Sequence, residues 1–202
     1  MRKFSVLAAT AVAVVAFGGV AAGGVASASD GRSSSDGRSY EADLNPIANN
    51  PPAHGSAELS VAGRKLTIRI HASGLTPNLP HAMHIHGVLG DKNSCPPGIS
   101  ADTNHDGLVS LSEGAPFYGP IDVSFTTTGD TSPASGLVLE RFPIADAHGN
   151  LNYNRSFMIP KKVANDLTQL HIVIHGNDLN HDGAYSNLME ATLPVACGAI
   201  ER

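Results

Sequence analysis

Three histidines carry the most specific chemistry in this sequence. His84 and His86 stand two residues apart in a short apolar run, and His175 closes a second apolar run that begins at Leu170. On a β-strand, alternate side chains point to the same face, so the imidazoles of His84 and His86 would project together. An imidazole from a second strand, His175, could close a three-nitrogen site, and imidazole binds copper, zinc, iron and nickel. Taken alone, an H-x-H pair is more often a packing or surface feature than a metal site.

A stretch of oxygen-bearing residues offers a different metal chemistry. Residues 102–113 fit the pattern D-x-[DN]-x-[DN]-G-x5-E, in which side-chain and backbone oxygens surround a calcium ion. The expected ligands are Asp102, Asn104, Asp106, the carbonyl of Leu108, Ser110 directly or through water, and bidentate Glu113. The alternative is a turn rich in Asp and Asn, which are ordinary turn formers. No flanking helices are expected, because three prolines (Pro96, Pro97 and Pro116) surround the loop.

A second loop repeats the first half of this pattern. Asp178, Asn180 and Asp182 have the same spacing and are followed by Gly183. The next acid, Glu190, comes one position later than the pattern requires. The second loop is therefore a weaker calcium candidate than the first, and a simple turn is again the alternative.

The elements that must hold these residues are short strands. Residues 57–61 and 65–71 alternate apolar and polar side chains around a turn, which predicts a hairpin. Further strands are expected over 82–86, 123–127, 137–141, 151–157 and 170–175, with one short helix over 162–167. Short strands separated by Gly, Pro, Asn and Asp indicate an all-β fold, an antiparallel sandwich or barrel.

The N-terminus predicts export. Residues 1–28 combine Arg2 and Lys3, an apolar run and the small-residue sequence Ala26-Ser27-Ala28, as a cleaved signal peptide does; an uncleaved anchor is the alternative. Residues 29–39 have the composition of a flexible linker, and 40–202 are expected to form one domain. Cleavage would change the net charge from −5 to −7 and leave no other membrane span. Without a basic stripe, nucleic acid is not an expected partner.

The two cysteines, Cys95 and Cys197, are expected to pair. An oxidising compartment makes a disulfide the default for an exported chain with two cysteines, and two free thiols are the alternative. The bridge would tie the long segment after His86 to the end of the last strand.

Several of these residues follow one another in the order that a known protein family shows. The hairpin and Gly74-Leu75-Thr76, the His84-Ile85-His86 strand, Cys95, the strand that ends at His175, and the terminal run Ala196-Cys197-Gly198-Ala199-Ile200 together resemble copper/zinc superoxide dismutase. The chain also resembles secreted bacterial CHRD-type domains, which carry a similar H-I-H-G strand. The resemblance covers roughly residues 40–200 and implies a Greek-key antiparallel β-barrel. It also implies that His84, His86 and His175 fall on three copper positions.

The chain departs from the dismutase pattern at other positions. The segment 96–128 holds one histidine, His105, whose surroundings do not match the family's bridging histidine. The run from Asp146 to Asn150 keeps only the Gly-Asn turn of the zinc region, so zinc is not expected. Pro194 occupies the position of the family's anion-guiding arginine.

These observations favour an exported copper-binding protein of the dismutase-like superfamily, with weak or absent superoxide dismutase activity. The alternative is a non-catalytic extracellular CHRD-like module stabilised by calcium and the disulfide. Other sources of protons or positive charge near the copper would be His81, Lys92 and His171. No nucleophile motif supports a protease or hydrolase, and no protein partner is indicated.

Overall fold

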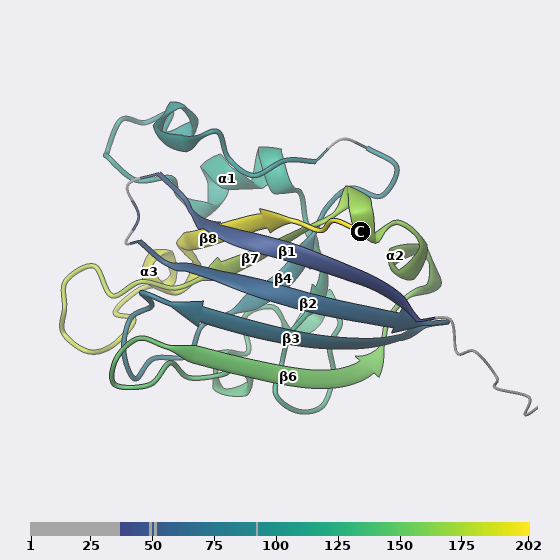
Figure 1. The fold of residues 1–202 in the computed structure, drawn as a ribbon. Helices are drawn as coiled ribbons and strands as arrows, with labels where there is room; N and C mark the ends of the chain where they lie inside the picture. Colours follow the sequence, from purple (N-terminus) through teal and green to yellow (C-terminus); the bar gives the residue numbers. More distant parts are fainter. Residues whose placement is uncertain (1–36, 49, 51, 92) are drawn as a thin grey trace, which may run out of the picture. The chain divides into compact units, whose positions relative to one another are not determined.

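The chain forms one antiparallel sheet of eight strands (Figure 1), in which β1, β2, β3 and β6 alternate buried and more exposed side chains. The computed structural model describes residues 37–48, 50, 52–91 and 93–202, which all fall in one compact unit. The expected signal peptide, Lys92 and most of the expected linker lie outside the described residues. The strands are β1 (Arg38–Pro46), β2 (His54–Ala62), β3 (Lys65–Ser73), β4 (Met83–His86), β5 (Ile121–Ser124), β6 (Leu151–Met158), β7 (His171–His175) and β8 (Pro194–Ala199).

The strands lie in the order β5-β4-β7-β8-β1-β2-β3-β6. Every neighbouring pair is antiparallel, and the sheet curls so that its two halves face each other (Figure 1). The expectation of an all-β antiparallel fold is confirmed. Among the described residues, no helix is long and apolar enough to cross a membrane.

The main core lies on the inner face of this curled sheet. Each strand contributes side chains that point to this face. Examples are Met83 and Ile85 of β4 and Ile172 and Ile174 of β7, all fully buried. Burying an aliphatic side chain of this size contributes roughly 1.5–3 kcal/mol relative to leaving it exposed. Because side chains alternate along a strand, the same burial sends His84 and His86 to the outer face of β4.

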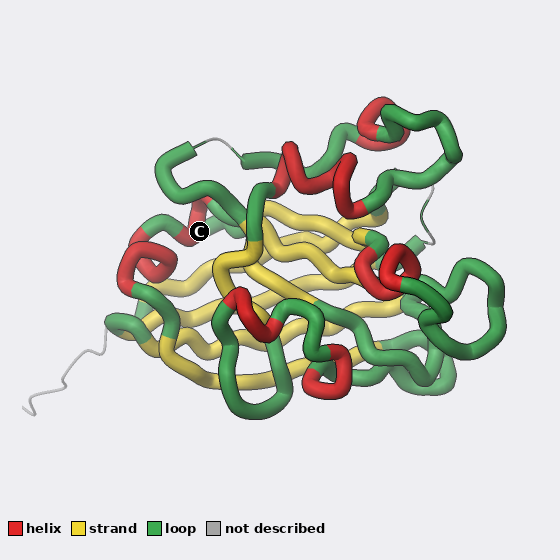
Figure 2. Tube along the Cα trace, turned by 180° about the vertical axis from the view of Figure 1, so that it is seen from behind, coloured by secondary structure: helices red, strands yellow, loops and turns green. Residues whose placement is uncertain are grey.

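Loops and short helices cover the outer face of β4, β7 and β8. Figure 2, which shows the molecule from behind, shows them lying over the strands. The helices are α1 (Leu111–Tyr118), α2 (Lys161–Asn165) and α3 (Leu188–Thr192), with 3-10 turns η1 (Gly98–Ala101), η2 (Pro133–Ser135), η3 (Leu139–Arg141) and η4 (Leu167–Gln169). A second core cluster joins these layers and consists of Ile47, Ala101, Val109, Tyr118, Val173 and Cys197.

Three expectations about the elements are wrong. Residues 137–141 form no strand, because Leu137 is exposed and the side chain of Arg141 holds the neighbouring loop through the carbonyls of Thr128 and Asp130. β1 begins at Arg38, inside the segment expected to be linker. Helix α1 begins at Leu111, within the last residues of the first acidic loop, although Pro116 lies inside the helix.

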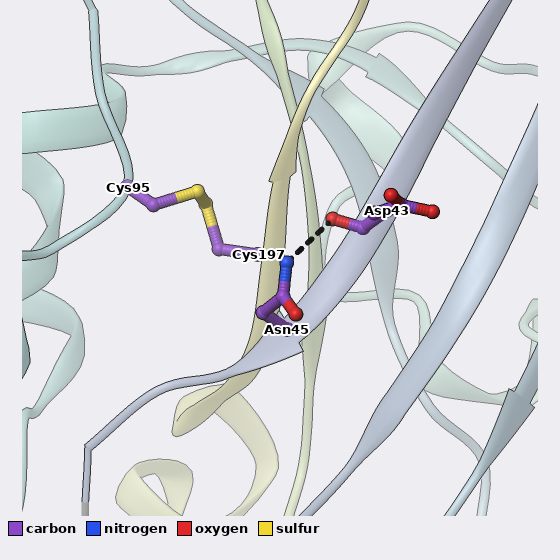
Figure 3. Close-up of a disulfide and its surroundings, with 4 residues drawn as sticks. All are labelled: Asp43, Asn45, Cys95 and Cys197. Atoms are coloured by element: carbon purple, nitrogen blue, oxygen red, sulfur yellow. Dashed lines mark hydrogen bonds between the residues drawn. A yellow bond between two sulfur atoms is a disulfide. The ribbon is translucent and has the colours of Figure 1, made fainter.

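The disulfide between Cys95 and Cys197 is confirmed. Its Cα atoms are 5.8 Å apart and the two residues are separated by 102 positions. Figure 3 shows the bridge running from the long segment between β4 and β5 to strand β8. Cys197 pairs with Asn45 of β1 and with Val173 of β7, so the bridge fastens this segment to the middle of the sheet.

Replacing both cysteines with serine should destabilise the protein by roughly 2–5 kcal/mol, because the loop-closure entropy of the unfolded chain is restored. Urea unfolding of the variant and the wild type measures the difference. The exposed pair Thr67→Ala and Ser156→Ala, which removes a cross-strand hydroxyl contact, serves as the control and should cost far less. Equal midpoints for the cysteine variant and the wild type would refute a stabilising bridge.

Candidate metal centre

Strands β4 and β7 bring the three predicted histidines together on the outer face of the sheet. The two strands are neighbours, and His84 pairs with Val173 while His86 pairs with His171. His175 follows a register shift at the end of β7, and its backbone N–H donates to the carbonyl of Ala82. All three side chains are buried.

The three imidazoles face one another. One nitrogen from each ring lies within 4.8 Å of one nitrogen of each of the others. The Nε2 atoms of His86 and His175 are 3.3 Å apart, and the ring centroid of His84 lies 5.3 and 5.2 Å from those of His86 and His175. Since metal–nitrogen bonds are about 2 Å long, nitrogens at this separation can share one ion. Among the described residues, this is the one close group of three His, Cys, Asp or Glu side chains.

Backbone carbonyls determine which nitrogen of each ring is free. His86 Nδ1 donates to Gly119 O at 2.9 Å, and His175 Nδ1 donates to Thr192 O at 2.9 Å. His84 uses its other nitrogen, Nε2, toward Gly136 O at 3.1 Å. A neutral imidazole has one donor and one acceptor nitrogen, so the lone pairs remain on Nε2 of His86, Nε2 of His175 and Nδ1 of His84. A second nitrogen anchored in this way is the usual arrangement of a metal-ligating histidine.

These three lone pairs have no proton donor. His84 Nδ1 is buried and lacks a hydrogen-bond partner, and the Nε2 atoms of His86 and His175 face each other as two acceptors. A buried polar atom without a partner costs about 1–3 kcal/mol. A cation among the three nitrogens would satisfy all of them at once, so the donor set fits a metal ion.

The electrostatics favour neutral rings. Burial lowers the pKa of His84 well below its usual range, and positive charge on His175 or His86 would lower it further. Burial, followed by repulsion from His175, lowers the pKa of His86 to about 3. Burial lowers the pKa of His175 to about 4. At neutral pH the three nitrogens are therefore available as ligands without losing a proton first.

A cavity of about 230 Å³ opens beside the imidazoles. Its walls come from α1, α3 and the segments that precede β5 and follow η2. The lining residues are Ala82, His84, His86, Leu111, Ala115, Tyr118, Gly119, Pro120, Ile121, Leu137, His175, Ala191 and Thr192. This described lining contains no lysine, arginine or carboxylate, so a small molecule in the cavity would meet mostly apolar surface.

The other histidines take different positions. His171 lies opposite His86 but outside the close group, with its buried Nδ1 unpartnered. The two ring nitrogens of His81 lie 3.0 Å from the backbone carbonyls of His175 and Thr76. His105 is exposed, and His54 and His71 are exposed as surface residues should be.

Sequence reasoning missed the groups that orient the ligands. Tyr118 is fully buried, and its ring centroid lies 4.8 Å from that of His86. The three anchoring carbonyls belong to Gly119, Gly136 and Thr192. Every residue has a carbonyl, so no residue type or spacing could have identified these three.

The first acidic loop is closed by hydrogen bonds. Glu113 accepts from the backbone N–H groups of Thr103, Asn104 and Ser110. The bonds from the backbone and hydroxyl of Ser110, followed by those from Asn104 N–H and the Thr103 hydroxyl, lower the pKa of its carboxyl to about 2. Asp102 Oδ2 accepts from Gly107 N at 2.9 Å. Asn104 and Asp106 lie exposed on the rim and bond to each other at 3.0 Å. Leu108 and Ser110 complete the loop, and Ser110 caps α1.

The second loop has the same arrangement despite its longer spacing. Asp178 Oδ2 accepts from Gly183 N, as Asp102 does from Gly107 N. Glu190 accepts from the backbone N–H groups of Leu179 and Ser186, which correspond to Thr103 and Ser110. Asn180 and Asp182 again bond to each other. Glu190 therefore takes the place of Glu113, because α3 begins one residue later and Asn187 caps it.

Comparison with protein-family models and with curated proteins finds no match for this chain.

Burial of the three histidines predicts a pH-dependent stability of the metal-free protein. The unfolded chain takes up protons near pH 6.5, whereas His86 and His175 in the folded chain do so only near pH 3 and 4. Between these limits the unfolded state binds more protons, so stability falls as the pH drops from about 7 to about 4. Urea midpoints across this range measure the loss.

The control for this prediction is a histidine that is not buried. His86→Gln should reduce the slope of stability against pH, and His71→Gln, at an exposed position, should leave it unchanged. The same slope in the wild type and His86→Gln would contradict the explanation.

Proposed function

We propose that this chain is an exported copper-binding protein of the superoxide dismutase-like superfamily, with weak or absent dismutase activity. One observation carries the proposal: three buried imidazoles each offer a nitrogen within 4.8 Å of the others, His84 Nδ1 has no hydrogen-bond partner, and the Nε2 atoms of His86 and His175 face each other. Burying such a group of lone pairs without a cation costs free energy. The group is well suited to a metal ion that prefers nitrogen ligands.

Copper fits this donor set better than a hard cation does. The close group offers only imidazoles, which suit copper and zinc, and no carboxylate, which calcium or magnesium would need. The resemblance assigns all three to copper positions, while the zinc region of that family is largely missing. When bound, copper would supply a one-electron redox couple.

The protein's own groups would hold and orient the ion. The carbonyls of Gly119, Thr192 and Gly136 keep each imidazole in the tautomer that points a lone pair inward. Tyr118 packs against the ring of His86 and restricts its rotation. Because the rings are already neutral and oriented, little ordering is needed when the ion binds.

The strand order supports the finer fold assignment. β1, β2, β3 and β6 are adjacent, as are β5, β4, β7 and β8, so the chain passes between the two halves after β3, β5 and β6. Repeated crossings of this kind are produced by Greek-key connections. The disulfide supports export, since such bridges persist in oxidising compartments.

Two features support binding rather than efficient dismutation. Superoxide is an anion, and the cavity lining contains no lysine or arginine among the described residues. Pro194, at the position of the family's guiding arginine, begins β8, and its carbonyl accepts a hydrogen bond from Asn50. Neither feature supplies the positive field that steers an anion to a buried metal.

A second candidate is a non-catalytic extracellular CHRD-like module stabilised by calcium and the disulfide. It is supported by the first acidic loop, in which Asp102 and Glu113 are buried. In that case the histidines would be structural, and copper would not bind with useful affinity.

The proposal predicts that copper binding depends on His86. His86→Ala should weaken copper binding by more than the roughly tenfold loss that follows removal of an outer hydrogen-bond partner. Competition titrations with a chelator measure the affinity, and the copper(II) spectrum reports nitrogen coordination. His54→Ala changes an exposed histidine and should bind copper like the wild type. Equal affinities for all three proteins would leave the module as the better account.

The proposal also predicts slow dismutation. Copper-loaded protein should react with superoxide far below the diffusion limit of about 10⁸–10⁹ M⁻¹s⁻¹. Its rate should show little of the decline with salt that positive steering produces. Pulse radiolysis at several ionic strengths measures both properties. A fast, salt-sensitive rate that disappears in His175→Ala would reverse the assignment to binding.

A further inference from the structure

A buried carboxylate oxygen in the first acidic loop lacks any partner. Asp102 is 5% exposed, and its Oδ1 is buried without a hydrogen bond. Its other oxygen, Oδ2, accepts from Gly107 N within the loop, which points the carboxylate into the loop. No lysine, arginine or histidine forms an ion pair with it among the described residues. An ionised carboxylate in this position requires a positive partner, because burying an unpaired charge is costly.

The surrounding loop supplies oxygens for a hard cation. Glu113, 8% exposed, lies at the far end of the loop with its carboxylate turned back toward Thr103 and Asn104. Asn104 and Asp106 are exposed on the rim, so their oxygens can turn to an incoming ion. Gly107 has a φ of 93°, a conformation that suits glycine and allows the sharp turn. Several oxygens at an exposed rim favour calcium over magnesium, which demands near-ideal octahedral geometry.

The loop also leads to the histidine centre. Glu113 belongs to the first turn of α1, where it forms a capping box with Ser110. Five residues after Glu113 α1 ends, and Gly119, whose N–H donates to Ala115 O, presents its carbonyl to His86 Nδ1. Tyr118, the last residue of α1, packs on His86. A cation that restrains the start of α1 therefore restrains the groups that orient His86.

We propose that the loop from Asp102 to Glu113 binds calcium and thereby holds α1 against the histidine centre. The calcium site is inferred from the unpartnered oxygen of Asp102 and from the oxygens around it. The effect on His86 rests on the proposed copper function. The second loop carries no such inference, because both oxygens of Asp178 already accept backbone hydrogen bonds.

Hydrogen exchange without copper tests the calcium site. Calcium should slow exchange in residues 111–119, with a half-maximal effect at roughly 10⁻⁴–10⁻³ M. Asp102→Asn keeps an acceptor for Gly107 N but removes the charge, and it should need at least about tenfold more calcium. Asp106→Asn, at an exposed position where folding is not endangered, should also weaken the effect.

The matched control is Asp178→Asn, the same change at the same position of the second loop, which should leave the protection of α1 intact. No calcium effect on residues 111–119 in the wild type, or the same effect in Asp102→Asn, would overturn the calcium site. These measurements contain no copper, so a failure of the copper proposal would not affect them.

A separate titration tests the link to His86. Calcium at saturating concentration should raise the copper affinity of the wild type by roughly fivefold or more, the lower range of ordinary couplings between sites. At a calcium concentration near the wild-type midpoint, the increase in Asp102→Asn should be much smaller than in the wild type. An unchanged copper affinity in the wild type would overturn the link to the histidine centre.

Discussion

Each buried imidazole of the centre depends on one backbone carbonyl. A neutral imidazole buried away from water needs an acceptor for its N–H, and Gly119, Gly136 and Thr192 supply the three acceptors. These carbonyls come from three separate connections: one between β4 and β5, one between β5 and β6, and one between β7 and β8. The inward-facing imidazole nitrogens of the three histidines lie close together only because all three connections are held over the same face of the sheet.

Covalent and packing interactions hold these connections in place. The disulfide fastens the segment before α1 to β8, and Val109 and Tyr118 pack against Val173 on the outer face. On the other side of the strands, Met83 and Ile85 enter the main core. A one-residue slip of β4 would exchange its histidines for these apolar side chains, so the core determines the register that presents the histidines.

The same architecture limits the chemistry that the centre can support. Burial keeps the imidazoles neutral, and the adjoining cavity is mostly apolar. This environment favours retention of a metal ion by nitrogen ligands, while it gives an anionic substrate little attraction. The two acidic loops end in the first turns of α1 and α3, so oxygen-rich and nitrogen-rich groups are joined by single short helices.

The all-β class, the disulfide and the three histidines could be recognised in the sequence because they depend on local periodicity and on rare residue types. Residues 65–71, for example, alternate so regularly that β3 follows from the pattern alone. β1 could have been recognised from the alternation of Tyr40, Ala42 and Leu44, but residues of linker composition precede it. The strand expected over 137–141 rests on the apolar run Leu137-Val138-Leu139, yet tertiary contacts of Arg141 place η3 there.

Two features depend on the tertiary structure alone. One is which nitrogen of each histidine is free, and the other is that Glu190 takes the position in the second loop that Glu113 has in the first. The tautomers depend on backbone carbonyls brought from distant connections, and carbonyls leave no trace in residue types. The place of Glu190 depends on where α3 begins. The second loop has one residue more before its carboxylate, and this residue lies at the start of α3, where Asn187 is the N-cap. Residue types and their spacing along the chain identified the groups that could form a site. Long-range packing determined which atoms of these groups lie close together.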